Sequence, residues 1–177
     1  MDPLDAALLG LVEGVTEYLP VSSTGHLILA ERLLGIPAGP AADAFAIAIQ
    51  GGAILAVLWA LRARTAQLAR GLAGRDAAGR ALLVALAVSF APAAAIGLAF
   101  DDWIEAHLFG LRPVVGAWFV GGVGLLWFER WRRARVGGPL EALTVRAALV
   151  IGLFQCLALW PGTSRSLATL VGGLCVG

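Results

Sequence analysis

Three long apolar runs without a charged side chain constrain the fold of this chain more than any other feature. They cover residues 44–61, 81–100 and 113–128. A helix crosses the hydrocarbon core of a bilayer with about 20 apolar residues, so each run is long enough, or nearly long enough, to span it. Only 14% of the residues are charged, where soluble domains have about a quarter. The sequence therefore predicts an all-α integral membrane protein.

Charged residues gather between these runs and predict the orientation of the chain. Residues 62–80 and residues 129–146 each contain five arginines, whereas residues 101–112 contain three acidic side chains. Cytoplasmic loops of membrane proteins carry an excess of basic residues. We therefore expect both Arg-rich loops in the cytoplasm and the acidic connection outside. The net charge of +1 gives no reason to expect a nucleic-acid partner.

Two further segments have the pattern of short helical hairpins. Residues 4–34 form two arms, each about half a membrane span long, around Pro20 and a Ser-Ser-Thr run. Residues 147–177 show a similar pattern around Pro161. Irregular backbone survives at membrane depth only where protein buries it or where it lines a wet cavity. We therefore expect two re-entrant hairpins.

The two hairpins are similar to each other and predict an inverted repeat. Residues 10–13 (GLVE) match residues 152–155 (GLFQ), and a Ser/Thr cluster follows both Pro20 and Pro161. An odd number of spans between the copies puts them in opposite orientations, and in such folds the broken helices meet at the binding site. Chance similarity between two apolar segments with Gly and Pro is the alternative.

The second copy of this repeat is expected to be incomplete. It contains little more than its hairpin, so about 90–100 residues of a full repeat are missing, either because the chain is a fragment or because it is naturally short. The predicted organisation is one membrane domain, residues 1–177, with a first re-entrant hairpin (1–43), three transmembrane helices (44–128) and the start of a second repeat (147–177).

Glu13 and Glu17 are the carboxylates of the first hairpin's first arm, and their i, i+4 spacing places them on one helix face. Ionisable side chains within membrane segments usually mark a functional site. The pair is suited to hold a divalent cation through oxygen ligands, or one carboxylate acts as an acid or a base. The structural alternative is a helix end that dips into water.

A run of hydroxyl side chains follows Pro20, and a histidine follows the run. Ser22 is placed to cap the second arm, whose N-terminus, with Thr24 in its first turn, offers free N–H groups to an anion. Ser23 lies three residues before His26, a spacing that suggests an activated hydroxyl nucleophile. The alternative is a capping run and a histidine hydrogen-bonded within a helix interface.

Arg165 is the charged residue of the second hairpin and lies between Ser164 and Ser166 at an expected helix start. Either Thr163 or Ser164 is expected to cap that helix, and Thr169 lies one turn further on the face of Arg165. A guanidinium at membrane depth needs a partner, and phosphate fits its planar fork. A structural salt bridge to a glutamate of the first hairpin is the alternative.

Together these residues predict a membrane site with two acidic groups, one histidine, several hydroxyls, two helix N-termini and one arginine. Such a set fits a phosphorylated substrate and a metal, because phosphoryl transfer depends mainly on charge neutralisation and positioning. Because the site is expected within the bilayer, the other end of the substrate is expected to be a lipid.

Two longer motifs resemble the undecaprenyl-diphosphate phosphatase family, also called bacitracin-resistance proteins. One covers residues 13–26 (EGVTEYLPVSSTGH) and the other residues 161–166 (PGTSRS) with Thr169; the run 154–161 (FQCLALWP) is also similar. The resemblance implies a hydrolase that removes one phosphate from undecaprenyl diphosphate and returns the monophosphate to peptidoglycan synthesis. It also implies a multi-pass protein of the bacterial inner membrane, a site facing the periplasm, inverted re-entrant repeats, and Mg²⁺ or Ca²⁺ as the cofactor.

The resemblance assigns roles position by position. Glu13 and Glu17 match an acidic pair, taken as metal ligands or acid/base groups, and Ser23 and His26 match a proposed nucleophile and its activator. The residues expected to bind phosphate, by resemblance or by their place at a helix N-terminus, are Ser22, Thr24, Ser164, Arg165, Ser166 and Thr169. Arg165 is counted as catalytic as well. Attack by Ser23 and attack by an activated water both remain open.

Two departures from the family pattern bear on activity. Leu167 stands beside Arg165 where the family usually has Gly, and the chain ends where the family continues. The leucine either crowds the phosphate or changes only the packing. The early end puts stability, and with it activity, in question.

Three rival functions are open. A transporter or flippase for the same lipid shares the inverted architecture but needs no nucleophile. Unrelated lipid phosphatases with a Ser-Gly-His element need a Lys-rich motif and a further His, whereas this chain has no Lys and no His after Arg165. An inactive fragment of the phosphatase is the third.

The expected partners are the polyprenyl diphosphate lipid, the bilayer and, in a homodimer, a second copy that completes the site.

Overall fold

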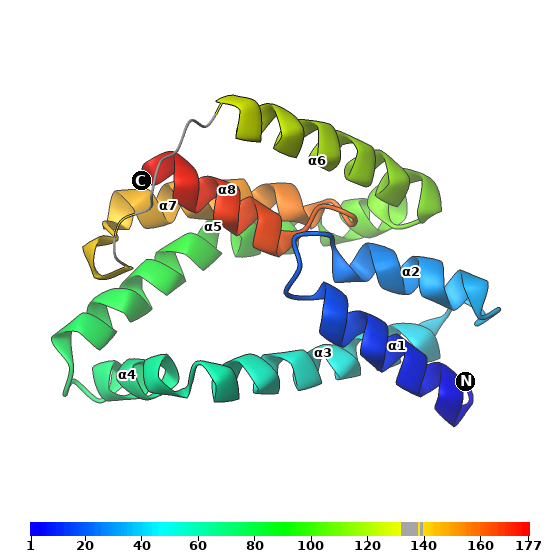
Figure 1. Cartoon of the computed structure of the whole chain (residues 1–177), viewed down its shortest axis with the longest axis horizontal. Coiled ribbons are helices and arrows are strands. Elements are labelled where there is room, and N and C mark those ends of the chain that lie inside the picture. Colours follow the sequence, from blue (N-terminus) through cyan, green and yellow to red (C-terminus); the bar gives the residue numbers. More distant parts are fainter. Residues whose placement is uncertain (132–137, 139) are drawn as a thin grey trace.

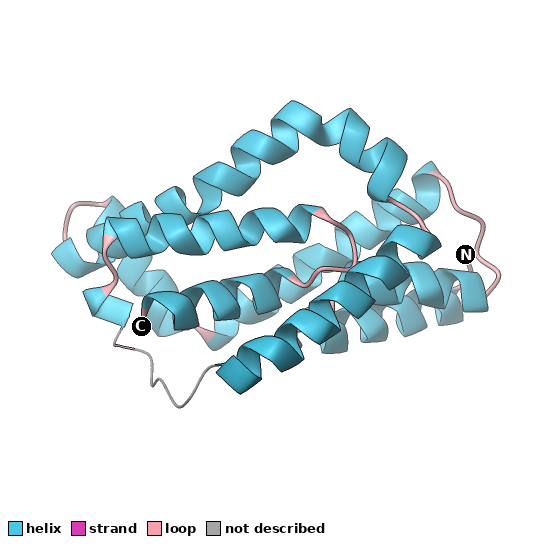
Figure 2. Cartoon of the chain, turned by 90° about the horizontal axis from the view of Figure 1, so that it is seen from above, coloured by secondary structure: helices cyan, strands magenta, loops and turns pink. Residues whose placement is uncertain are grey.

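The computed structural model describes residues 1–131, 138 and 140–177, and this part consists of helices and loops without a strand (Figure 2). The elements in chain order are α1 (Pro3–Thr16), α2 (Ser23–Leu33), α3 (Pro40–Ala60), α4 (Arg62–Leu72), α5 (Ala77–Leu108), α6 (Leu111–Trp131), the 3₁₀ helix η1 (Leu140–Ala142), α7 (Val145–Gln155), the 3₁₀ helix η2 (Cys156–Leu159) and α8 (Arg165–Val176). The predicted all-α class is confirmed.

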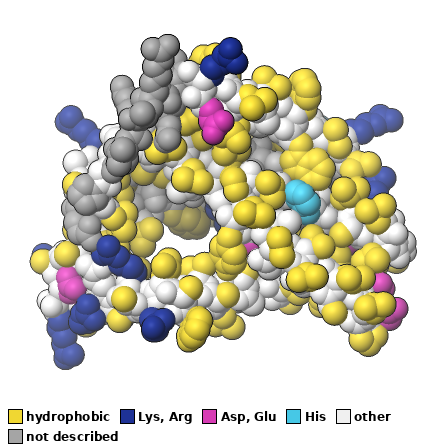
Figure 3. All heavy atoms as spheres, in the orientation of Figure 1, with side chains coloured by type: hydrophobic (Ala, Val, Ile, Leu, Met, Phe, Trp, Pro, Cys, Tyr) yellow, Lys and Arg dark blue, Asp and Glu magenta, His cyan; other side chains and the backbone are white. Residues whose placement is uncertain are grey.

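Among the described residues, α3, α5 and α6 are long and apolar enough to cross a membrane, with mean hydropathies of 1.8, 2.3 and 1.5. They contain the three predicted apolar runs, apart from Leu61 at the end of the first. At most 11% of each apolar window is buried inside the protein, and apolar side chains cover much of the face in Figure 3. An apolar surface of this extent requires a nonpolar environment. The chain is therefore a multi-pass membrane protein.

Two of the predicted loops are wrong, because helix continues into them. α5 runs through residues 101–108, which the sequence predicts as part of an acidic connection, although Phe100 departs from helical angles (φ −124°, ψ 18°) at their start. The Arg-rich segment 62–80 contains α4, which is rich in good helix formers such as Ala, Arg, Leu and Gln. A charge ends an apolar run but does not end a helix. The other Arg-rich segment, 129–146, lies partly outside the described residues.

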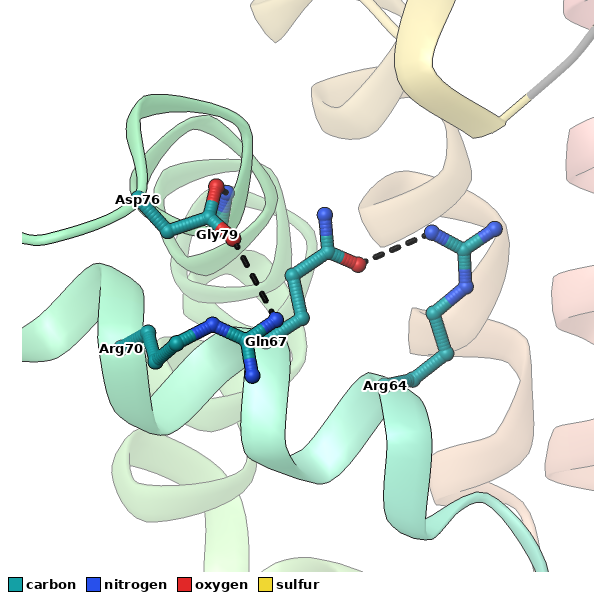
Figure 4. Close-up of polar contacts among 5 residues, drawn as sticks. All are labelled: Arg64, Gln67, Arg70, Asp76 and Gly79. Carbon is teal, nitrogen blue, oxygen red and sulfur yellow. Dashed lines mark hydrogen bonds and ion pairs between the residues drawn. The ribbon is translucent and has the colours of Figure 1, made fainter.

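The turn between α4 and α5 packs the two helices closely (Figure 4). Asp76 caps α5 by accepting from the N–H of Gly79 at 2.8 Å, and its carboxylate lies 3.6 Å from Arg70. Arg64 donates to the side chain of Gln67 at 2.9 Å. The close approach requires Gly79, because a Cβ there would stand 2.2 Å from the carbonyl oxygen of Gln67. This contact, more than the exposed ion pair, fixes α4 against α5.

The two predicted hairpins enter from opposite ends of the long axis, and their turns lie near its middle (Figure 1). The first consists of α1 and α2, and the second of α7, η2 and α8. α7 lies against α5: a Cβ at Gly152 would be only 2.6 Å from the carbonyl oxygen of Ser89, to which Gln155 also donates at 3.3 Å. The predicted pairs of short helical arms are therefore present, with their turns inside the molecule.

Candidate active site

The polar side chains of the first hairpin are positioned by the end of α1 and the start of α2. α1 ends at Thr16, and Glu17 follows as its C-cap in helical conformation, so Glu17 keeps its i, i+4 relation to Glu13. Ser22 caps α2, as predicted, and accepts from the N–H of Gly25 at 3.4 Å. Its φ of +67° is uncommon for a residue other than glycine, and such residues cluster at functional sites.

Glu13, Glu17 and Ser23 form a cluster inside this hairpin. Glu13 is only 1% exposed, and neither of its carboxylate oxygens has a hydrogen-bond partner in the described part of the chain. The Ser23 hydroxyl donates to Glu17 Oε2, and the charges of Glu13 and Glu17 repel each other. A buried carboxylate without a partner is unfavourable, so this cluster would be stabilised by a cation.

His26 packs against Trp118 of α6, with ring centroids 5.0 Å apart, and its Nδ1 lies 2.8 Å from the carbonyl oxygen of Ser22. A carbonyl oxygen only accepts, so Nδ1 carries a proton, and in the neutral imidazole Nε2 is then the acceptor. The Ser23 hydroxyl donates to Glu17 and not to His26. The sequence did not indicate that Trp118 is a partner of His26. The predicted pairing of Ser23 with His26 is not observed, and Ser23 pairs with the carboxylate of Glu17 instead.

The turn of the second hairpin is fixed against α6. Trp160 Nε1 donates to the carbonyl oxygen of Pro113 at 3.1 Å. Gly162 has a φ of +101° and lies so close to Val114 that a Cβ would stand 2.8 Å from the Val114 carbonyl oxygen. Of the two predicted caps, Thr163 and Ser164, it is Ser164 that caps α8, and its hydroxyl accepts from the N–H of Leu167 at 3.2 Å. These contacts determine where α8 begins.

A hydrogen bond joins the two hairpins: Ser166 Oγ donates to the carbonyl oxygen of Glu17 at 3.2 Å. Thr169 uses its hydroxyl within α8, donating to the carbonyl oxygen of Arg165 at 2.9 Å. The Arg165 side chain is exposed. In the described residues no ion pair joins it to Glu13 or Glu17, so the salt-bridge alternative is not observed and the guanidinium is available to an anion.

Between the two turns lies a cavity of about 70 Å³, called here the polar cavity. Its lining residues come from both hairpins and from α3: Glu17, Ser22, Ser23, Thr24, Gln50, Ala158, Thr163, Ser164, Arg165 and Ser166. Seven of the predicted site residues are among them. Glu13, His26 and Thr169 do not line it, and His26 lines a neighbouring apolar cavity instead. Gln50 was missed, although it is the one polar side chain of the predicted span 44–61.

The residues present fit a divalent cation. Glu13 offers two buried oxygens without partners, and Glu17 offers a second carboxylate beside them. The described residues contain no group of three or more His, Cys, Asp or Glu side chains that could hold a metal ion. Mg²⁺ is commonly bound by one or two carboxylates together with waters and the phosphates of a substrate, and the pair of glutamates suits that mode.

Comparison with known proteins gives consistent matches along nearly the whole chain. A family model described as bacitracin resistance protein BacA matches residues 6–177. The chain is 49% identical to undecaprenyl-diphosphatase 2 of Rhodospirillum rubrum, over 98% of this chain and 63% of that protein. It is 50% identical to the undecaprenyl-diphosphatase of Sorangium cellulosum, over 96% of this chain and 56% of that protein. The chain thus spans less than two thirds of the length of these relatives.

Proposed function

The chain belongs to the bacitracin resistance protein BacA family, and from this premise we propose that it hydrolyses undecaprenyl diphosphate to undecaprenyl monophosphate and phosphate. The relatives are named for this activity. The reaction recycles the lipid carrier for peptidoglycan synthesis and thereby confers resistance to bacitracin. The observation that carries the proposal is the gathering of Glu17, Ser23 and Arg165 around one polar cavity between two hairpin turns.

Both turns provide groups that bind a diphosphate. α2 and α8 begin at this cavity with Ser22 and Ser164 as their caps. The N-terminus of a helix attracts anions through its free N–H groups and its dipole. Arg165 adds a planar pair of donors suited to phosphate oxygens. The site thus offers positive potential from two directions, while Ser166 keeps the second turn close to Glu17.

The cluster of the first hairpin provides the reactive groups. Glu13 and Glu17 would hold Mg²⁺ or Ca²⁺, which when bound neutralises charge on the phosphate oxygens. Glu17 accepts the hydrogen bond of the Ser23 hydroxyl, so it can take the Ser23 proton as Oγ attacks the terminal phosphorus and the lipid monophosphate leaves. A water then hydrolyses the phosphoserine, which releases phosphate and restores the Ser23 hydroxyl. The other route is attack by a water whose proton is taken by Nε2 of His26. A phosphoserine trapped at Ser23 by acid quenching during turnover would indicate the first route, and its absence while phosphate is released would indicate the second.

The membrane placement rests on the charges and on the hairpins. The Arg-rich α4 and the start of α7 lie at one end of the long axis, and the acidic end of α5 lies at the other (Figure 1). This favours a multi-pass protein of the bacterial inner membrane with α4 in the cytoplasm. The hairpins are re-entrant copies of an inverted repeat, as their entry from opposite ends supports, and the site faces the periplasm. A homodimer stays a prediction.

The test is phosphate release from undecaprenyl diphosphate by the purified chain in detergent, with Mg²⁺, with Ca²⁺ and with a chelator. We expect release with either ion, loss of release with chelator, and a fall of at least about 100-fold in Glu17→Ala, because the variant lacks both a cation ligand and the proton acceptor of Ser23. Asp101→Ala, an exposed carboxylate remote in sequence from both motifs, is the matched control. Release that is unchanged in Glu17→Ala would contradict the proposal.

A further inference from the structure

Two apolar cavities lie side by side along α6, next to the polar cavity. One has a volume of about 330 Å³ and is lined by the first turn, α6 and the start of α8. The other, of about 480 Å³, continues between α6, α7 and α8 as far as Cys175. The two share Gly121, Leu125, Thr163 and Leu167 in their walls. They therefore form one continuous depression, called here the apolar groove.

The apolar groove begins at the polar cavity. Ser164 lines the polar cavity and the first apolar cavity, and Thr163 lines the polar cavity and both apolar cavities. Polar and apolar sites thus meet at the turn that precedes α8. A ligand with a charged head and a hydrocarbon chain could lie across this turn, with the head among the hydroxyls and the chain on α6.

The floor of the groove consists partly of glycines that the described fold does not need for packing. A Cβ at Gly121, Gly122 or Gly124 would meet no atom of the described residues within 4 Å. Glycine inside a helix lowers its stability, and small residues in membrane helices usually allow a close neighbour. These three glycines leave space where no neighbour is described. By contrast, Gly152 and Gly162 are in contact with backbone.

We propose that the apolar groove holds the part of the substrate's hydrocarbon chain nearest the diphosphate, with Gly121, Gly122 and Gly124 as its floor and Leu167 as the residue that limits the bulk of the chain. This inference rests on the proposed function. Leu167 is half-buried in the first turn of α8, where the two cavities adjoin. A hydrocarbon chain suits the groove because the groove joins the polar cavity at Thr163 and Ser164, where the charged head of the same molecule would lie.

Photocrosslinking tests the proposal without depending on hydrolysis. The probe is undecaprenyl monophosphate, the reaction product, with a diazirine on one of the isoprene units nearest the phosphate, and the crosslinked residues are identified by mass spectrometry of the purified chain. We expect crosslinks on α6 and α8 in the groove, including Leu125 or Cys175. They should fall at least tenfold in Gly121→Leu and in Leu167→Trp and stay unchanged in Gly52→Leu. Gly52 is the matched control, because it lies in α3, away from the walls of the groove, and a Cβ there would also meet no described atom within 4 Å.

The outcomes separate this inference from the proposed function. Groove crosslinks in a chain that releases no phosphate would support the groove and count against the activity. Crosslinks that are the same in Gly121→Leu and in the unchanged chain would overturn the groove. A lower melting temperature or a changed oligomeric state of Gly121→Leu, with crosslinking unaffected, would show that protein rather than lipid covers this face, and would overturn it too.

Discussion

Glu13 carries a carboxylate that is buried in the first hairpin, with no hydrogen-bond partner for either oxygen in the described part of the chain. Removing a charge from water costs several kcal/mol unless a partner compensates for it. The nearest acidic neighbour, Glu17, adds repulsion. Such a group is unfavourable for the fold alone and is understandable where a cation binds. If the proposed cation binds, Glu13 links the stability of the hairpin to the occupancy of the site.

Glu13→Gln is expected to stabilise the chain and to inactivate it. In the presence of chelator the neutral amide removes the buried charge, so the free energy of unfolding should rise by about 1 kcal/mol or more, about 2–4 °C in melting temperature. Mg²⁺ should raise the melting temperature of the unchanged chain, because it binds the folded state, and should no longer do so in the variant. Glu105→Gln, which changes an exposed carboxylate of α5, should behave like the unchanged chain. A lower melting temperature of Glu13→Gln in chelator would contradict this account.

At the scale of helices, the sequence predicts best where local chemistry decides. Pro20 and Pro161, each with a hydroxyl run behind it, were enough to predict two short hairpins, because caps such as Ser22 and Ser164 act over three residues. The ends of α5 were not predictable from the apolar run, because the helix continues through charged residues that face no core. The pairing of Ser23 with Glu17 was not predictable, because it joins side chains six residues apart across a turn in which Ser22 has a positive φ.

Contacts between helices depend on single glycines, and Gly152→Ala tests this. The added methyl group would stand 2.6 Å from the carbonyl oxygen of Ser89, so α7 must move away from α5. We expect a loss of about 1–3 kcal/mol, as for other overpacked sites, which thermal unfolding in detergent would report as a fall of several degrees. Gly173→Ala in α8 is the control: its Cβ would meet no atom within 4 Å, so the same change should be neutral or stabilising by about 0.5–1 kcal/mol. Equal effects at both positions would refute a role for close α5–α7 contact.

Across the whole molecule, charge and shape are aligned along one axis. From Ala77 to the non-helical Phe100, α5 is about 35 Å long, which already exceeds the roughly 30 Å of a hydrocarbon core. Its acidic last turns consequently extend out of the apolar region at the end opposite to α4 (Figure 1). The two hairpins bring their turns to the middle of the same axis, where the polar cavity lies. The side of the membrane from which the polar cavity is reached therefore depends on which end of this axis lies in the cytoplasm.

Labelling of single cysteines in intact cells determines which end of the long axis lies in the cytoplasm. With Cys156 and Cys175 replaced by Ser, Arg70→Cys places a thiol on α4 and Glu105→Cys places one near the end of α5, both at exposed positions. Because Arg-rich segments are retained in the cytoplasm, a membrane-impermeant maleimide should label Glu105→Cys at once, and Arg70→Cys only after the membrane is permeabilised. The reverse pattern would place α4 in the periplasm. The first hairpin would then enter from the cytoplasm, which would contradict a site that faces the periplasm.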